Sequence, residues 1–141
     1  MGTNRQIHME LEPGWVDQTI YVFHGPDAAG IQHLLTVLID DDPGEAQLDA
    51  YARDRIAIQT ANQGGMVALT EGGGQWEDGT EFYEFVYRWN TGAGQPEYWR
   101  QVYVLLEGRA VTFSGRYAKH TSRTVGTEMD RMIRTFRVEG S

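Results

Sequence analysis

Residues 81–113 read EFYEFVYRWNTGAGQPEYWRQVYVLLEGRAVTF, and the centre of the predicted sheet lies within them. It contains three runs with alternating side chains, separated by a Gly-rich break at residues 91–94 and by the dipeptide Glu107-Gly108. Residues 81–106 alone hold eight of the chain's 16 Phe, Trp and Tyr side chains. We predict three consecutive antiparallel strands at the centre of a sheet.

The dipeptide Glu107-Gly108 sets the register of the second and third of these strands. It is a natural two-residue hairpin turn, so the residues on either side of it pair in a fixed order. Across the longer loop at residues 90–97, we match like side chains with like. The predicted pairs are Val104 with Val111, Val102 with Phe113, Leu105 with Ala110, Tyr103 with Thr112, Gln101 with Ser114, Trp89 with Trp99, Tyr87 with Gln101 and Phe85 with Tyr103.

This register divides the strands into two unlike faces. One face is aliphatic and suits packing against helices, and its charged interruptions, Glu84, Arg88 and Arg100, are expected near an edge. The other face is aromatic and small-polar. The aliphatic face holds Phe82, Val86, Val102, Val104, Leu106, Val111 and Phe113. The aromatic face holds Tyr83, Phe85, Tyr87, Trp89, Trp99, Gln101, Tyr103, Thr112 and Ser114.

The aromatic face has two interpretations. It is either a second layer of core or a shallow groove for an apolar partner, because Tyr and Trp are common at binding surfaces. Gln101 is the informative residue. A buried amide without a partner costs about 1–3 kcal/mol, so Gln101 either pairs inside the domain, with Ser114 or Tyr87, or meets a bound partner.

The remaining chain supplies further strands and two helices. A helix over residues 45–63 is expected to be capped by Asp42, and a second helix covers residues 124–136. Glycines 72–74 read as part of a turn. Strands are expected at residues 5–11, 18–24, 31–39 and 66–70. We therefore predict one domain over residues 1–141, of the α+β class: a twisted, mainly antiparallel sheet of about six or seven strands with both helices on one side.

Composition narrows the functional classes. The formal net charge of −8 disfavours nucleic acid and anionic membranes as partners. No apolar run is long enough to span a bilayer, and residues 1–14 lack the apolar segment of a secretory signal. With no cysteine as well, these features favour a cytoplasmic protein.

No motif for catalysis or for a cofactor is present. The four His residues show no metal-binding spacing, and the acidic cluster at residues 40–45 lacks the pattern of a Ca²⁺ loop. Ser114-Gly115 lacks the GxSxG context of a nucleophile, and neither Gly-rich segment opens a helix as a phosphate-binding loop does. We predict a protein that is not an enzyme and needs neither cofactor nor metal.

Three segments resemble a known family. They are WVDQTIYVF at residues 15–23, YRW at residues 87–89 and RQVYV at residues 100–104. Together they resemble the DcrB-related family, and more narrowly the Eag chaperones of bacterial type VI secretion. The order of elements agrees over roughly residues 6–138, and the first segment is the most specific of the three.

The resemblance implies a PsbP-like α/β/α sandwich, a homodimer and a cytoplasmic chaperone. Such a chaperone shields the N-terminal transmembrane helices of an effector, near the spike protein that carries it. In that family an apolar groove accepts the helices, and glutamines on a strand and on a helix contact them. Gln101 matches the strand glutamine, Ile20 and Val22 match apolar groove positions, and Arg55 stands at the helix position. The candidate partner-binding groove is therefore Ile20, Val22, Arg55, Phe85, Tyr87, Gln101 and Tyr103.

Two other functions stay open at this point. The same concave face could belong to a small-ligand-binding module, which would need titratable groups converging there. It could also serve only as the dimer interface of a structural domain with no role in secretion.

Overall fold

The computed structural model describes residue 10 and residues 12–13, 19–28, 31–44, 47–90, 92, 94, 96–119 and 122–136. Six strands and two helices follow one another within these ranges. They are β1 (Thr19–Ala28), β2 (Ile31–Asp40), α1 (Leu48–Asn62), β3 (Met66–Gln75), β4 (Glu81–Trp89), β5 (Glu97–Leu106), β6 (Arg109–Tyr117) and α2 (Ser122–Arg134). The strand predicted at residues 5–11 lies outside the described residues, apart from Glu10.

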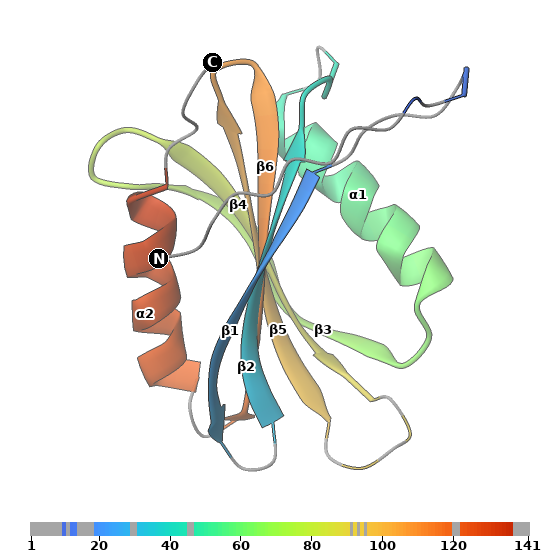
Figure 1. The fold of residues 1–141 in the computed structure, drawn as a ribbon, viewed down its shortest axis with the longest axis vertical. Coiled ribbons are helices and arrows are strands. Elements are labelled where there is room, and N and C mark those ends of the chain that lie inside the picture. Colours follow the sequence, from blue (N-terminus) through green and yellow to red (C-terminus); the bar gives the residue numbers. More distant parts are fainter. Residues whose placement is uncertain are drawn as a thin grey trace.

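The strands form one antiparallel sheet in the order β1-β2-β6-β5-β4-β3. The sheet is strongly twisted, and the two helices lie on opposite sides of it (Figure 1). The prediction that both helices share one side is therefore wrong, whereas the α/β/α arrangement is confirmed. Neither described helix is long and apolar enough to cross a membrane.

The turn between β5 and β6 has the backbone that the sequence predicts. Both turn residues have positive φ, 52° at Glu107 and 80° at Gly108, as a type I′ hairpin turn requires. All five predicted pairs between β5 and β6 are confirmed, from Val104 opposite Val111 to Gln101 opposite Ser114. The two faces of the sheet are consequently the two that the sequence predicts.

The pairing of β4 with β5 differs from the prediction by two residues. Tyr87 lies opposite Trp99, Phe85 opposite Gln101 and Tyr83 opposite Tyr103. Matching like side chains across a long loop carries no geometric constraint, so the loop allowed a different offset. An offset of two residues keeps every side chain on its predicted face, because side chains alternate with a period of two.

Each face of the sheet has its own helix and its own core. The aliphatic face packs against α2, and its buried residues are Leu35, Val37, Val102, Val104, Val111, Phe113, Tyr117, Met129 and Ile133. The aromatic face packs against α1, and its buried residues are Leu48, Tyr51, Ala52, Ile56, Tyr83, Phe85, Tyr87, Tyr103 and Ala110. The core-layer interpretation of the aromatic face is thus correct where α1 covers it.

A charged cluster joins α2 to the middle of the sheet. The Arg100 guanidinium donates to the Glu84 carboxylate at 2.5 Å and to the Asp130 carboxylate at 2.6 Å. Glu84 and Arg100 therefore lie under α2 rather than near an edge of the sheet, which corrects the expectation. Asp130, on the helix, is the reason, because it gives Arg100 a second carboxylate in this half-buried position.

Two boundaries also differ from the prediction. Residue Gln47, not Asp42, precedes α1, because Gly44 turns the chain with φ 81° before the helix begins. Glycines 72–74 belong to β3 rather than to a turn. A Cβ atom on Gly74 would come within 2.5 Å of the Phe82 ring, so the glycine lets this ring lie against the strand.

We expect the β5–β6 turn to control stability through its backbone alone. Gly108→Ala should lower the free energy of unfolding by about 1–2 kcal/mol, because Ala is strained at φ 80°. A Cβ at Gly108 meets nothing within 4 Å, so no clash contributes. Urea denaturation measures the change. Gly72→Ala, on exposed β3 with equal free space, is the control and should stay within about 0.5 kcal/mol of the unmodified protein.

We expect the Arg100 cluster to stabilise the docking of α2. Arg100→Ala should cost about 1–3 kcal/mol, since it leaves two partly exposed carboxylates without their cation. Glu77→Gln, which removes the exposed ion pair of Glu77 with Arg134, should change stability by less than about 0.5 kcal/mol. Equal effects of the two substitutions in chemical denaturation would contradict a special role for Arg100.

Candidate functional site

Helix α1 covers only part of the aromatic face. It packs against β4 and β5, and the core beneath it has no member from β1 or β2. On the same face, the side chains of Ile20 and Val22 in β1 are 56% and 51% exposed. The β1 edge of this face is thus left without helical cover by the described residues.

A cavity of about 360 Å³ lies on the aromatic face of the sheet, beside α1. Its floor comes from four strands and its wall from α1. We call it the α1 groove, and it is lined by Ile20, Thr36, Leu38, Tyr51, Arg55, Gln59, Gln101, Tyr103, Thr112 and Ser114.

Strand register explains why these side chains meet. Residues that pair across antiparallel strands project from the same face of the sheet. One row of such pairs runs from β1 to β5 through Ile20, Leu38, Thr112 and Tyr103. The next row runs through Val22, Thr36, Ser114 and Gln101. Val22 therefore shares the floor's face and extends it at the β1 edge, although it does not line the cavity itself.

Gln101 is the buried polar residue of the groove, at 6% exposure. Its Oε1 accepts a hydrogen bond of 2.9 Å from the Tyr103 hydroxyl. Its pairing inside the domain is therefore with Tyr103, not with Ser114 or Tyr87. No described residue accepts a hydrogen bond from the Gln101 Nε2 group. This Nε2 group is not one of the fully buried polar atoms that lack a partner, so water or a bound molecule can accept its hydrogen bonds.

Arg55 is held by a carboxylate at one side of the groove. It donates to Asp40 at 3.1 Å and lies over the Tyr51 ring at 4.9 Å. The Tyr51 hydroxyl donates to the same Asp40 carboxylate at 2.8 Å. Burial and this hydrogen bond raise the pKa of Tyr51 to about 12, so the phenol stays neutral. Arg55 therefore brings little net charge to the groove, because Asp40 neutralises it.

Gln59 is a groove residue that the candidate list missed. It lies on α1 one turn beyond Arg55 and donates at 3.1 Å to the Tyr87 hydroxyl. The signal was present in the sequence, since residues four apart on a helix share a face. The structure thus places one glutamine on the strand side of the groove and one on the helix side.

Phe85 and Tyr87 do not line the groove, which corrects their assignment. Each is 2% exposed and belongs to the core under α1. Their rings stack on each other with centroids 5.2 Å apart, and the Tyr87 ring also stacks with Trp99 at 6.4 Å. The inference from an aromatic face to an open groove overlooked α1, which needs these rings as its packing surface.

The lining suits binding rather than proton transfer. The described lining residues have aliphatic, hydroxyl, phenol and amide side chains, apart from Arg55, which is paired with Asp40, and none of them is His, Cys, Lys, Asp or Glu. Burial raises the pKa of Tyr103, so this phenol also stays neutral. Among the described residues, no group of three or more His, Asp or Glu side chains could hold a metal ion.

Two solved structures share the fold of this chain. A crystal structure of a Pseudomonas aeruginosa protein of unknown function, PA94, described as a putative regulator, matches with a TM-score of 0.71 and 15% identity. The match covers 94% of this chain and 92% of that one. The solution structure of the PsbP protein CyanoP from Synechocystis sp. PCC 6803 matches with a TM-score of 0.56 and 17% identity, over 89% and 95% of the two chains. The fold is therefore PsbP-like.

Sequence comparison identifies the family. No curated protein matches the chain. Residues 7–135, nearly the whole sequence, match the DcrB family. The chain belongs to the DcrB family.

Proposed function

We propose that the α1 groove binds apolar transmembrane helices at the N-terminus of a type VI secretion effector and shields them from water. The protein would act in the cytoplasm as an Eag-type chaperone, close to the spike protein that carries the effector. The observation that carries this proposal is Gln101, which lines an otherwise mostly apolar and hydroxyl-lined groove and whose Nε2 group has no acceptor among the described residues.

The chemistry of the groove matches that of a transmembrane helix. Such a helix exposes apolar side chains in water, and covering them yields about 25 cal/mol per Å². Helices of this kind also carry Ser, Thr and Gly, whose hydroxyl and carbonyl oxygens can accept hydrogen bonds. Ile20, Val22 and Leu38 offer apolar surface, while Gln101 offers a donor. The resemblance to Eag chaperones implies one glutamine on a strand and one on a helix. Gln101 matches the strand position, Arg55 stands at the helix position, and Gln59 lies one turn further along α1 in the same groove.

The size of the groove indicates how a helix would be held. A helix with its side chains is about 10–12 Å across, so a cavity of about 360 Å³ holds a few side chains and not the whole helix. The helix would lie along the exposed Ile20–Val22 strip and insert part of one face. A second copy of the chain would then be needed to cover its other side, in agreement with the homodimer that the resemblance implies.

The cavity volume also favours a second candidate. About 360 Å³ lies within the range of small-molecule sites, so the groove could bind a small apolar ligand instead. A binder of small ligands would protect a short apolar molecule from water but would not keep a transmembrane segment in solution. A third possibility, a groove used only for self-association, would leave no site for either.

A substitution at Ile20 tests the groove. Ile20→Asp should weaken capture of a carrier protein fused to a helix of about 20 residues of Leu, Ala and one Ser by about tenfold or more, because it places a charge against the apolar helix. The measurement is co-purification after co-expression, quantified by the amount of fusion kept in solution. Tyr21→Asp is the matched control, since Tyr21 is similarly exposed but projects from the opposite face of the same strand. Equal loss in both variants, or in neither, would refute the groove assignment.

A double-mutant cycle tests the role of Gln101. Gln101→Leu and replacement of the Ser in the helix by Ala should show a coupling of about 0.5–1.5 kcal/mol if the amide bonds to that hydroxyl. Titration of the purified protein with the fusion gives the four affinities, and circular dichroism checks that each variant is folded. Additive effects would mean that Gln101 serves only its bond with Tyr103.

A further inference from the structure

The sheet opens between β4 and β5 at one end. The ladder between them runs from the pair Trp89–Glu97 to the pair Tyr83–Tyr103 and stops there. Both strands continue beyond that point, β4 to Glu81 and β5 to Leu106. Figure 1 shows the hairpin of β3 and β4 curving away from β5 towards α2. Two neighbouring strands thus separate while each stays paired on its other side.

The separated strands turn backbone hydrogen-bonding groups towards each other. In a two-residue hairpin the residues flanking the turn exchange hydrogen bonds, so Leu106 bonds to β6 and Leu105 directs its N–H and C=O to the β4 side. In the β3–β4 hairpin, the Trp76 N–H donates to the Thr80 carbonyl, so these two residues form a hydrogen-bonded pair. The next pair, Gln75 with Glu81, is then not hydrogen-bonded, and the backbone N–H and C=O of Glu81 point towards β5. Edges of this kind pair with an added strand.

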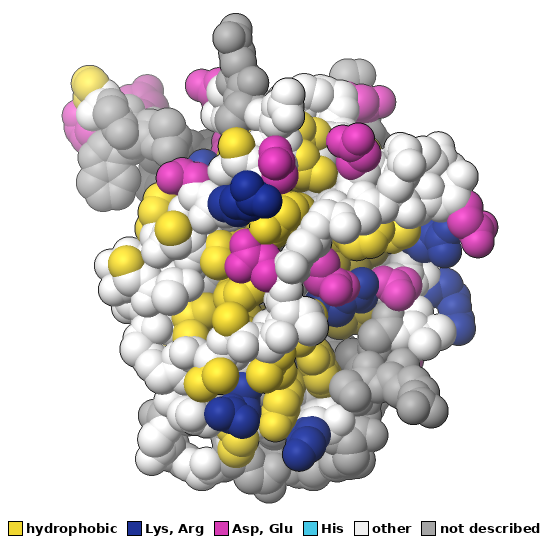
Figure 2. All heavy atoms as spheres, turned by 180° about the vertical axis from the view of Figure 1, so that it is seen from behind, with side chains coloured by type: hydrophobic (Ala, Val, Ile, Leu, Met, Phe, Trp, Pro, Cys, Tyr) yellow, Lys and Arg dark blue, Asp and Glu magenta, His cyan; other side chains and the backbone are white. Residues whose placement is uncertain are grey.

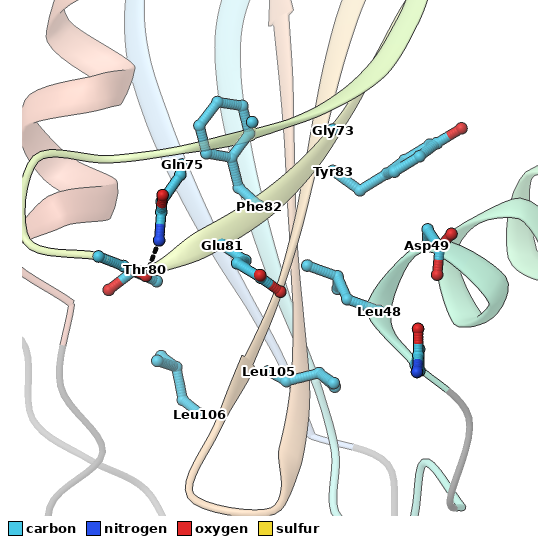
Figure 3. Close-up of a pocket in the computed structure, with 13 residues that line it drawn as sticks. Leu48, Asp49, Gly73, Gln75, Thr80, Glu81, Phe82, Tyr83, Leu105 and Leu106 are labelled. Atoms are coloured by element: carbon cyan, nitrogen blue, oxygen red, sulfur yellow. Dashed lines mark hydrogen bonds between the residues drawn. The ribbon is translucent and has the colours of Figure 1, made fainter.

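A cavity of about 840 Å³ lies at this opening. Figure 3 shows Leu48 of α1, Glu81 of β4 and Leu105 of β5 around the same space, with the Tyr83 ring extending towards α1. We call it the β4–β5 cleft. It is lined by Gln47, Leu48, Asp49, Gly73, Gly74, Gln75, Gly79, Thr80, Glu81, Phe82, Tyr83, Leu105 and Leu106.

The charges of the cleft have one sign. Asp49 and Glu81 line it and both are exposed, and none of the described lining residues is Lys or Arg. Arg53, one turn further along α1, donates to the Tyr83 hydroxyl at 3.2 Å. Two apolar residues of the lining, Leu48 and Leu105, lie on the same side of the sheet as these carboxylates, whereas Phe82 projects from the α2 side. A partner that carries an apolar side chain next to a cationic one matches this pattern.

We propose that the β4–β5 cleft binds an extended peptide segment of another protein, with apolar side chains flanked by Lys or Arg. The peptide forms main-chain hydrogen bonds with Leu105 and Glu81, inserts an apolar side chain beside Leu48, and sets its cations against Asp49 and Glu81. This site is separate from the α1 groove, and it does not depend on the function proposed for that groove.

Gly73 gives a means of blocking the cleft. A Cβ on Gly73 would meet only the Phe82 carbonyl at 3.6 Å and the Tyr83 ring at 3.8 Å, which are ordinary contacts. Gly73 pairs with Tyr83 and so shares its face, on the α1 side. Gly72 pairs with Glu84, projects from the other face, and has nothing within 4 Å. Gly73→Val therefore fills the cleft, and Gly72→Val is the matched control on the same exposed strand.

The experiment uses the hexapeptide acetyl-Lys-Thr-Leu-Thr-Leu-Lys-amide and NMR spectra of the full ¹⁵N-labelled chain. At about 1 mM peptide, we expect the amide signals of Leu105 and Glu81 to shift and their hydrogen exchange to slow. Gly73→Val should weaken binding by about tenfold or more, and Gly72→Val should leave it unchanged. A control peptide with Glu in place of both Lys should bind the unmodified protein about tenfold more weakly than the lysine peptide does, or weaker still.

Three results would overturn the proposal. One is the absence of any shift at Leu105 and Glu81 in the unmodified protein. Another is equal binding of a peptide whose alternate amides are N-methylated, because main-chain hydrogen bonds would then play no part. The last is protection of both amides without peptide in a dimer of the chain, which would assign the cleft to a second copy. If Gly73→Val does not fold, Leu105→Lys replaces it, since this partly exposed position can take a cation that repels the probe.

Discussion

The two-residue turn at Glu107 and Gly108 determines which side chains each face of the sheet presents. Its positive φ angles fix the register of β5 against β6, and side chains alternate between faces with a period of two. A slip of one residue would move Gln101 and Tyr103 to the α2 side and Val102 and Val104 to the α1 side. Each helix would then meet the wrong surface. A local backbone preference, set by two residues, thus decides which chemistry each side of the sheet presents.

The two faces hold their helices in different ways, and this difference produces the groove. On the aliphatic side, Val and Phe side chains pack against Met129 and Ile133, and Arg100 adds an ionic contact to Asp130. On the aromatic side, α1 buries four of its residues against the rings of β4 and β5. Among the described residues, β1 contributes none to this core and β6 contributes only Ala110. The α1 groove is therefore the part of a core layer that its helix does not cover. Figure 2 shows the molecule from behind, where hydrophobic side chains are interspersed with acidic and basic ones.

Features that depend on adjacent residues were predicted correctly from the sequence, whereas features that depend on contacts between distant residues were not. The β5–β6 register was predictable because two adjacent residues determine it, and Gln101 followed from that register onto the correct face. The side of the sheet taken by each helix was not predictable from periodicity, since a helix stripe does not specify which sheet face it meets. Phe85 and Tyr87 were misassigned for this reason, because their environment depends on α1, about 30 residues earlier in the chain. Gln59 was visible in the stripe of α1, but only the three-dimensional arrangement brings it to Gln101's cavity.

Helix α1 forms part of the wall of both the α1 groove and the β4–β5 cleft. Leu48 and Asp49, in its first turn, line the β4–β5 cleft, and Tyr51, Arg55 and Gln59, further along, line the α1 groove. The helix rests on only four buried residues, so its position depends on a small area of apolar contact. A ligand in either site adds contacts to the same rigid element. Any shift of α1 that one ligand favours must change the geometry that the other ligand meets, and by linkage the effect is reciprocal. The anchoring of Tyr51 and Arg55 on Asp40 of β2 limits such a shift, because it fixes the middle of the helix to the β1-β2-β6-β5 side of the opening.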